Sequence, residues 1–270
     1  MSQRPPRKIK AHETAITLTP GEIAFVRAMV ICQDDDIIAL NKPSGLSSQG
    51  GRINAHTLDE LTWAFARKGG SRPRLIHRLD RDTSGVILTA RTKPAASFLG
   101  KAMIAKRFRK TYLAIVAPGA PSPKGGTIDS ALRRESIGRE AYMRVTDPDH
   151  PDAESARTRY RTLAATPDAA LMELSPETGR MHQLRVHMAS IGRPIVGDAR
   201  YGGALMVGGH PVPRLMLHAA KLTFPHPDEV PMTVEAPLPD DMVALAAALG
   251  LAVPATSDTS STPRGAEETD

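Results

Sequence analysis

A chain of 270 residues with 41% hydrophobic and 24% charged side chains can bury a core and has an ordinary globular composition. Its single cysteine, Cys32, excludes an intrachain disulfide and a zinc site built from cysteines, which fits a reducing compartment. The formal net charge of +6 favours a polyanionic partner, although solubility alone would also explain it. No segment has the pattern of a signal peptide or a membrane span, so we expect a cytoplasmic protein without membrane contact.

The two ends of the chain differ in composition from the region between them. Residues 1–25 are rich in Arg, Lys and Pro and are expected to form a flexible basic arm. Residues 250–270 are rich in Ser and Thr, end acidic, and are expected to be a disordered tail. Residues 26–249 contain no internal repeat and no linker, which predicts a single domain.

Short apolar runs bounded by turn residues predict more strands than helices. In chain order we expect a strand at Ile37–Leu40, a helix at Leu58–Arg67, a strand at Val86–Ala90, a helix at Pro94–Lys106, strands at Tyr112–Val116, Thr158–Leu163 and Ala170–Leu174, and helices at His182–Ile191 and Pro239–Leu249. Many strands with few helices between them favour an α+β fold whose mixed sheet is mainly antiparallel.

Residues 74–85 form a polar loop that leads directly into the predicted strand at Val86. The loop places Asp80 and Asp82 among arginines, with a rigid strand behind them, which is a suitable position for a catalytic carboxylate. Such an aspartate could act as a nucleophile or a base. The alternative is a surface cluster of ion pairs, which would have little energetic weight.

Residues 177–192 combine basic side chains with apolar residues at helical spacing. His182 and Arg185 are three residues apart and can point together into a cleft. His182 and His187 are five apart, which misses the four-residue spacing of a helical metal pair, so we expect no metal site. The alternative is an amphipathic helix with a solvated basic face.

Two shorter segments carry groups that can contact a nucleic acid. Basic residues run into Tyr112, which can stack on a base or be a half-buried strand tyrosine. In residues 41–46 a strand ends in a turn through Pro and Gly, and Lys42 is expected to be free to meet a phosphate. The glycine spacing there is not that of a P-loop.

Six groups of segments follow one another in a fixed order along the chain and resemble the motif series of the RluA-type pseudouridine synthases. They are Asp34–Leu46, His77–Gly85, Lys110–Ala114, Ala156–Tyr160, Thr178–His187 with Pro194–Asp198 and Tyr201–Gly202, and Leu217–Ala219 with Phe224–Pro227. The resemblance covers residues 31–237, although residues 118–151 match no motif. The stretch before the first motif is too short for the S4 RNA-binding module of many relatives, so we expect none.

The resemblance implies a pseudouridine synthase-like fold with a central catalytic cleft. It also implies an isomerase that flips a uridine out of ribosomal or transfer RNA and converts it to pseudouridine. Members of the family need neither a cofactor nor a metal, so we expect RNA as the partner, no small-molecule cofactor, and a monomer.

The resemblance also assigns residues to the site. Asp80 matches the essential aspartate, which acts on the ribose as nucleophile or base. Arg185 matches the arginine that pairs with it, and Tyr112 matches the tyrosine that stacks on the flipped uracil. The expected substrate-binding residues are Arg78, which enters the space left by the base, Leu217, which packs the pocket, and Lys42, Arg180, His182 and Gln183, which bind or position the backbone.

Two other functions remain as alternatives at this point. A non-catalytic RNA-binding or ribosome-assembly factor could keep the fold, but it would have no need of Asp80. A hydrolase of nucleosides or sugars would need two cooperating carboxylates, for which Asp82 is the obvious second candidate.

Overall fold

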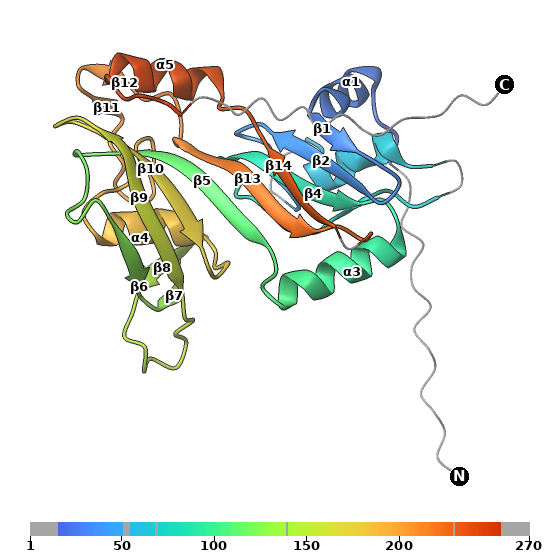
Figure 1. The fold of residues 1–270 in the computed structure, drawn as a ribbon, viewed down its shortest axis with the longest axis horizontal. Coiled ribbons are helices and arrows are strands. Elements are labelled where there is room, and N and C mark those ends of the chain that lie inside the picture. Colours follow the sequence, from blue (N-terminus) through green and yellow to red (C-terminus); the bar gives the residue numbers. More distant parts are fainter. Residues whose placement is uncertain (1–15, 51–54, 68–69, 139, 229, 255–270) are drawn as a thin grey trace, which may run out of the picture.

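The structure is a computed structural model that describes residues 16–50, 55–67, 70–138, 140–228 and 230–254. The described residues form a 10-stranded sheet with helices packed against it (Figure 1). The order of its strands is β1 (Val30–Gln33), β2 (Ile37–Lys42), β4 (Ser84–Ala90), β13 (Leu217–Pro225), β5 (Arg109–Val116), β10 (Ala170–Pro176), β9 (Arg157–Ala165) and β6 (Gly125–Asp129), with β3 (Arg74–Leu75) paired to β4 and β14 (Pro231–Glu235) paired to β13.

Neighbouring strands in this sheet are antiparallel except for β13 and β4, which are parallel. Two further hairpins join β7 (Leu132–Ile137) to β8 (Glu140–Val145) and β11 (Met206–Val207) to β12 (His210–Pro211). The helices are α1 (Pro20–Ala28), α2 (Leu58–Leu61) with a following 3-10 turn (Thr62–Phe65), α3 (Lys93–Ile104), α4 (Gln183–Ser190) and α5 (Asp240–Ala248). The expected α+β fold with a mixed, mainly antiparallel sheet is confirmed.

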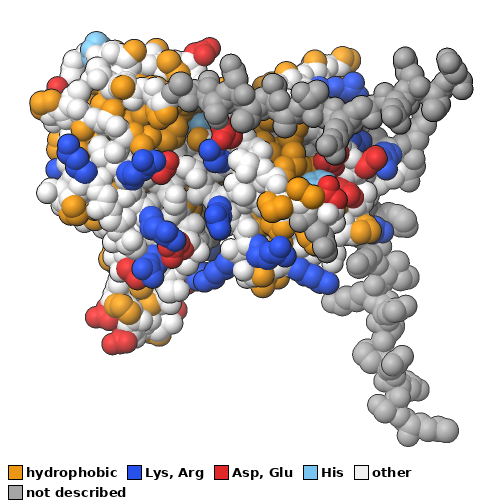
Figure 2. Space-filling model, viewed as in Figure 1, with side chains coloured by type: hydrophobic (Ala, Val, Ile, Leu, Met, Phe, Trp, Pro, Cys, Tyr) orange, Lys and Arg blue, Asp and Glu red, His pale blue; other side chains and the backbone are white. Residues whose placement is uncertain are grey.

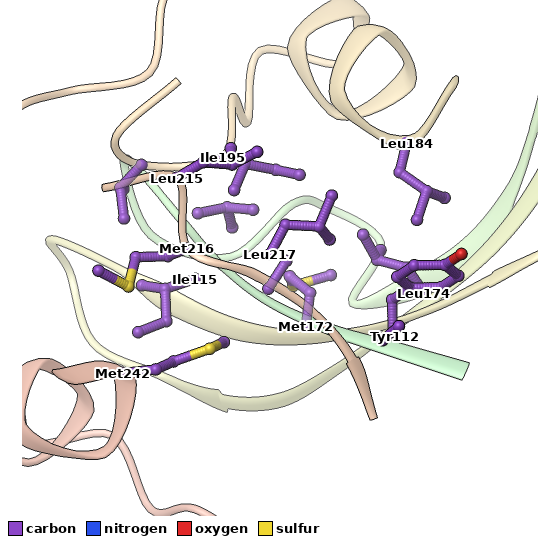
Figure 3. Packing of buried hydrophobic residues seen from close by; sticks show 14 of the residues in the cluster. Tyr112, Ile115, Met172, Leu174, Leu184, Ile195, Leu215, Met216, Leu217 and Met242 are labelled. Atoms are coloured by element: carbon purple, nitrogen blue, oxygen red, sulfur yellow. The ribbon is translucent and has the colours of Figure 1, made fainter. Parts of the chain in front are cut away.

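Apolar residues on both faces of the central strands bury this sheet. Successive residues of a strand point to opposite faces. Accordingly, Leu40 and Ile87 belong to a core shared with α1, α2, α4 and α5, and Leu88 belongs to a second core that contains Leu99 of α3. Figure 3 shows part of the first core around the β5, β10 and β13 strands. The central strands are therefore held by packed side chains on both faces.

Gly85 marks the point where the Asp80 loop enters β4. Its φ of +113° is open to glycine, and a Cβ there would collide with the backbone of Ala219 on β13. The parallel β4–β13 pairing joins Ser84 to His218 and Gly85 to Ala219. The glycine therefore allows the loop and β13 to approach closely.

All five expected strands and the four expected helices exist, and their bounds differ by a few residues. The largest difference is the helix expected over Leu58–Arg67, whose α-helical part ends at Leu61. The ordered domain extends beyond the predicted residues 26–249 at both ends. Helix α1 begins at Pro20, inside the expected arm, and Leu251 is 3% exposed in the core, inside the expected tail. The rest of both termini, residues 1–15 and 255–270, lies outside the described residues.

Among the described residues, no helix combines the length and apolar character that a membrane span requires.

Candidate active site

A pocket lies where the loop before β4 meets β5 and the beginning of α4. Its lining includes every site residue predicted from the sequence except Lys42, and it adds Lys110 of β5: Arg78, Asp80, Lys110, Tyr112, Arg180, His182, Gln183, Arg185 and Leu217. The residues come from segments more than 100 positions apart along the chain. The sheet order, which places β5 beside β13 and β13 beside β4, brings them together.

Lys42 is fully buried and holds the loop that carries Asp80. Its Nζ donates hydrogen bonds to the backbone carbonyls of Pro43 (2.9 Å), Leu46 (2.8 Å) and Arg81 (3.0 Å). Burial lowers the pKa of Lys42 to about 7, against the opposing charges of Asp82 and Asp80. Three carbonyl acceptors match the three donors of an ammonium group. The expectation that Lys42 is free to meet a phosphate is therefore wrong, because no donor is left.

Two histidines, His77 in the same loop and the fully buried His218 of β13, remain neutral. His77 Nε2 accepts a hydrogen bond from the Leu88 N–H (3.1 Å), and burial lowers the pKa of His77 to about 3. Ser84 Oγ and His218 Nδ1 are 2.9 Å apart, and burial lowers the pKa of His218 to about 4. Both rings serve as neutral hydrogen-bonding groups that join the loop to β4 and β13.

Arg185 and His182 of the α4 segment face Asp80 from the other side of the pocket. Arg185 Nη1 lies 3.6 Å and His182 Nε2 lies 3.9 Å from Asp80 Oδ2. Arg185 makes its shorter contacts with Asp198, where Nε and Nη2 each lie 2.7 Å from a carboxylate oxygen. The predicted pairing of Arg185 with Asp80 is present, but Asp198 is the closer partner.

Tyr112 supplies a flat, mostly apolar surface next to Asp80. The residue is 9% exposed and belongs to the first core, and Figure 3 shows its ring beside Leu174 and facing Leu184 of α4. Burial, and then the charge of Asp80, raise the pKa of Tyr112 above its usual range. Leu217, 3% exposed, lines the same pocket. The pocket thus combines a charged wall with an apolar surface on which a base can stack.

Gln183 and Arg180 line the pocket, but both are already engaged within the protein. Gln183 is 3% exposed, and its amide contacts Thr178 Oγ1 (2.7 Å) and the Arg157 carbonyl (3.0 Å). Arg180 Nη1 lies 2.6 Å from a carboxylate oxygen of Glu154. These two side chains hold the segment before α4 in place, and Arg78 is the more exposed cation at the pocket.

His182 has a backbone conformation that sequence patterns could not indicate. It precedes α4 with a φ of 53°, in the left-handed region that non-glycine residues rarely adopt. This conformation places the ring beside Asp80 and Tyr201. His187 is instead buried against Thr158 and Ser130. In the part of the chain that the structure describes, no group of three His, Cys, Asp or Glu side chains is arranged to hold a metal.

Sequence reasoning gave no role to Lys110, Asp198 or Tyr201, although all three lie in motif segments of the resemblance. Asp198 and Tyr201 come from the loop after α4 and contact Arg185 and His182 from behind. The only sequence feature that linked Asp198 and Tyr201 was their presence in one short segment, Asp198-Ala-Arg-Tyr201. Their role depends on contacts with Arg185 and His182, which a local pattern does not indicate.

Comparisons with known proteins point in one direction. The family described as RNA pseudouridylate synthase matches residues 36–190. Ribosomal large subunit pseudouridine synthase C of Vibrio vulnificus is 33% identical over 237 residues, covering 86% of this chain and 73% of that protein. RNA pseudouridine synthase 4, mitochondrial, of Arabidopsis thaliana is 37% identical over 220 residues, covering 74% of this chain and 45% of that protein. The solved structure of Human RNA Pseudouridylate Synthase Domain Containing 4 has a TM-score of 0.72 at 27% identity, covering 87% of this chain and 99% of that chain.

Proposed function

The chain belongs to the RNA pseudouridylate synthase family, and we propose that it converts a uridine of large-subunit ribosomal RNA into pseudouridine. The resemblance inferred from the motifs is thereby confirmed, and the chain is an RNA pseudouridine synthase. The choice of ribosomal RNA over transfer RNA is supported by the name of the Vibrio vulnificus relative. The alternative of a non-catalytic RNA-binding factor is disfavoured.

The observation that carries the proposal is the position of Asp80 in the pocket. Its carboxylate lies within 4 Å of two side chains of the α4 segment, His182 and Arg185, and beside the buried ring of Tyr112. A nucleoside needs both kinds of surface, since its base stacks on apolar groups and its ribose requires a polar reacting group. An RNA chaperone would have no use for this arrangement.

In our proposal the target uridine leaves its stack and enters the pocket, with the uracil against Tyr112 and the ribose at Asp80. Asp80 acts on the ribose as nucleophile or base while the C1′–N1 bond breaks. The uracil then turns, and C1′ bonds to C5 as Asp80 leaves C1′ or returns the proton it took from the ribose. C5 loses its proton and N1 takes one up, so the product is an isomer of uridine. Arg185 orients the Asp80 carboxylate, and Leu217 packs the pocket.

Cations that are not neutralised by nearby carboxylates would bind the RNA backbone. On β9 this condition fails, because Arg159 Nε lies 2.5 Å from Glu177 and Arg161 Nη2 lies 3.1 Å from Glu173. In Figure 2 several Lys and Arg side chains likewise lie beside Asp or Glu side chains. We therefore propose that Arg78, exposed at the pocket, makes the principal contact with the flanking nucleotides and enters the space left by the base.

A cytoplasmic location and a monomeric state, both expected from the sequence, remain part of this proposal. The relative from Arabidopsis thaliana has mitochondrial in its name, so relatives of this chain are not confined to one compartment.

Mapping pseudouridine in total RNA tests the proposal. Cells lacking the protein are complemented with the wild type or with Asp80→Asn, which keeps the size of the side chain but removes its charge. We expect one or a few sites in large-subunit ribosomal RNA to lose pseudouridine and only the wild type to restore them. Purified Asp80→Asn should bind the RNA as the wild type does and form no product.

Two outcomes would contradict different parts of the proposal. Pseudouridine formation by Asp80→Asn would remove Asp80 from the mechanism. Loss of sites confined to transfer RNA would keep the enzyme and overturn the proposed substrate. Another synthase could modify the same uridine in cells. In that case, pseudouridine formation by the purified wild type and Asp80→Asn is measured on RNA transcribed without modifications.

A further inference from the structure

Behind the pocket, Arg185 is divided between two carboxylates at different distances. Asp198, 1% exposed, binds its guanidinium through two contacts of 2.7 Å, while the remaining nitrogen, Nη1, lies 3.6 Å from Asp80. A planar guanidinium can form one such two-pronged pair along each edge. Asp198 therefore fixes the plane of the group and leaves its free edge toward Asp80.

This division of contacts has a chemical consequence for Asp80. A carboxylate held in a close two-pronged pair has its lone pairs engaged with donors and must break those bonds before it reacts. Because Asp198 occupies the Nε edge, Arg185 orients Asp80 through a longer contact that leaves the carboxylate oxygens accessible. The buried charge of Arg185 is balanced mainly by Asp198, whose hydrogen bonds and charge raise the pKa of Arg185 against the opposing effect of burial.

Tyr201 holds His182 from behind, as Asp198 holds Arg185. Its Oη lies 2.8 Å from His182 Nδ1 and accepts a hydrogen bond from the Met143 N–H at 3.0 Å. The Tyr201 hydroxyl can donate its hydrogen to Nδ1 of the neutral imidazole, which corresponds to the tautomer with the ring hydrogen on Nε2. That nitrogen faces Asp80 at 3.9 Å. The Tyr201 ring also lies 5.0 Å from Cζ of Arg185.

One short loop carries both supports. Asp198 Oδ1 accepts hydrogen bonds from the backbone N–H groups of Arg200 (3.0 Å) and Tyr201 (3.2 Å), so the carboxylate that binds Arg185 also shapes the turn that places Tyr201. Tyr201 in turn contacts Met143 of β8. The support thus extends from the pocket to the β7–β8 hairpin, within residues 118–151, which match no motif.

We propose that Asp198 and Tyr201 are positioning residues that orient Arg185 and His182 toward Asp80 and keep Arg185 from closing onto the reacting carboxylate. The inference rests on the proposed function, since it assigns roles around Asp80 in the same reaction. It predicts that Asp198 affects the chemical step and leaves RNA binding unchanged, because neither residue lines the pocket.

The test compares Asp198→Asn with a matched control, Asp241→Asn. Asp241 binds Arg214 through two contacts of 2.6 Å, so the control removes the same charge from a pair of the same geometry, at a more exposed side chain and away from the Asp80 pocket. Steady-state kcat and KM for an RNA substrate are measured at neutral pH, with thermal unfolding of each protein. Asp198→Glu tests whether a restored carboxylate recovers part of the activity.

We expect Asp198→Asn to lower kcat about 100-fold with KM unchanged, because a small displacement of a reacting group has an effect of this order. Asp198→Glu, which restores the carboxylate, should recover part of kcat. A loss of kcat caused by partial unfolding would instead follow the thermal unfolding of each variant. The other charged or titratable groups around Asp80 stay the same in both variants: His182, Tyr112, Lys110, Lys42, Arg78 and Asp82.

If Asp198→Asn does not fold, Tyr201→Phe tests whether this loop positions the groups around Asp80. It keeps the ring under Arg185 and removes the hydroxyl, and we expect kcat to fall about fivefold to tenfold, the size set by one hydrogen bond. Wild-type kcat in Asp198→Asn, or equal changes in Asp241→Asn, would overturn the role of Asp198. Unchanged kcat in Tyr201→Phe would overturn that of Tyr201. An inactive wild-type protein would instead count against the proposed function.

Discussion

The loop that carries Asp80 and the helix that carries Arg185 face each other across the pocket, but different forces hold them. On the loop side, side chains bind backbone: Lys42 donates to three carbonyls, and the hydroxyl of Ser48 donates to the Leu79 carbonyl (2.7 Å) and accepts from its N–H (3.1 Å). On the α4 side, charged side chains bind one another. Backbone contacts fix the position of a residue, whereas ion pairs also determine the local electric field.

This difference separates two requirements of the reaction. The reacting carboxylate belongs to the loop, where hydrogen bonds to the backbone hold the main chain around Asp80. The charges that adjust its reactivity belong to α4 and the loop after it. The comparison predicts that damage to the α4 side changes the chemistry strongly, and that damage to the loop side changes stability and geometry more gradually.

Replacement of Arg185 by Met should produce the largest effect. It leaves Asp198, with a 1% exposed side chain, as an unpaired buried charge, so we expect the free energy of unfolding to fall by about 3–5 kcal/mol. Activity should fall as well, because Asp80 loses its orienting partner. Urea unfolding and product formation are measured together. In the control, Arg214→Met leaves the 39% exposed side chain of Asp241, which should cost about 1 kcal/mol or less. Equal costs, or full activity of Arg185→Met, would contradict the role assigned to the α4 side.

Acid pH tests the loop side. His77 and His218 have folded pKa values of about 3 and about 4, below the ordinary value of 6.5, so the unfolded chain binds more protons between about pH 4 and pH 6.5. Stability from these groups is complete above pH 6.5 and is lost as the pH falls toward the folded values. We expect the free energy of unfolding to decrease by about 1.4 kcal/mol per pH unit for each histidine.

Urea titrations at pH 6.5, 6.0, 5.5 and 5.0 measure this slope. Burial also lowers the pKa values of His182 and His187 on the α4 side, so the loop contribution is isolated with His218→Gln. In this variant the decrease of the free energy of unfolding with falling pH should be smaller by the contribution of one histidine, about 1.4 kcal/mol per pH unit. A slope that His218→Gln leaves unchanged would mean that His218 is not protected from protonation by the fold.

Replacement of Lys42 by Met should have the smallest of the three effects. Three partly buried carbonyls lose their donor, but the desolvation of the lysine is relieved as well, so we expect the free energy of unfolding to fall by roughly 1–3 kcal/mol. A looser Asp80 loop should lower kcat moderately, with the salt dependence of RNA binding unchanged. The same change at the half-exposed Lys221 serves as the control and should alter neither quantity. If Lys42→Met instead weakened RNA binding and its salt dependence, Lys42 would contact phosphate after all.

The sequence by itself determined the α+β class, the five strands β2, β4, β5, β9 and β10, and the location of Asp80 in a polar loop before a buried strand. These features depend on local patterns such as apolar runs, turn residues and helical spacing. It did not predict β13, which lies between β4 and β5 in the sheet, and it also missed strands with weak local patterns. Strand β6 begins with Gly125 and Gly126, and β7 and β8 bury few apolar side chains, among them Leu132 and Met143.

Only the tertiary structure decided which side chains around Asp80 are free and which are already bound. Lys42 is the clearest case, since a lysine after a strand looks exposed until the loop folds over it. Asp198 is the opposite case, because its role depends on a return of the chain under α4. Burial and pairing across the fold depend on strand order and register, which bring together residues that no local pattern relates.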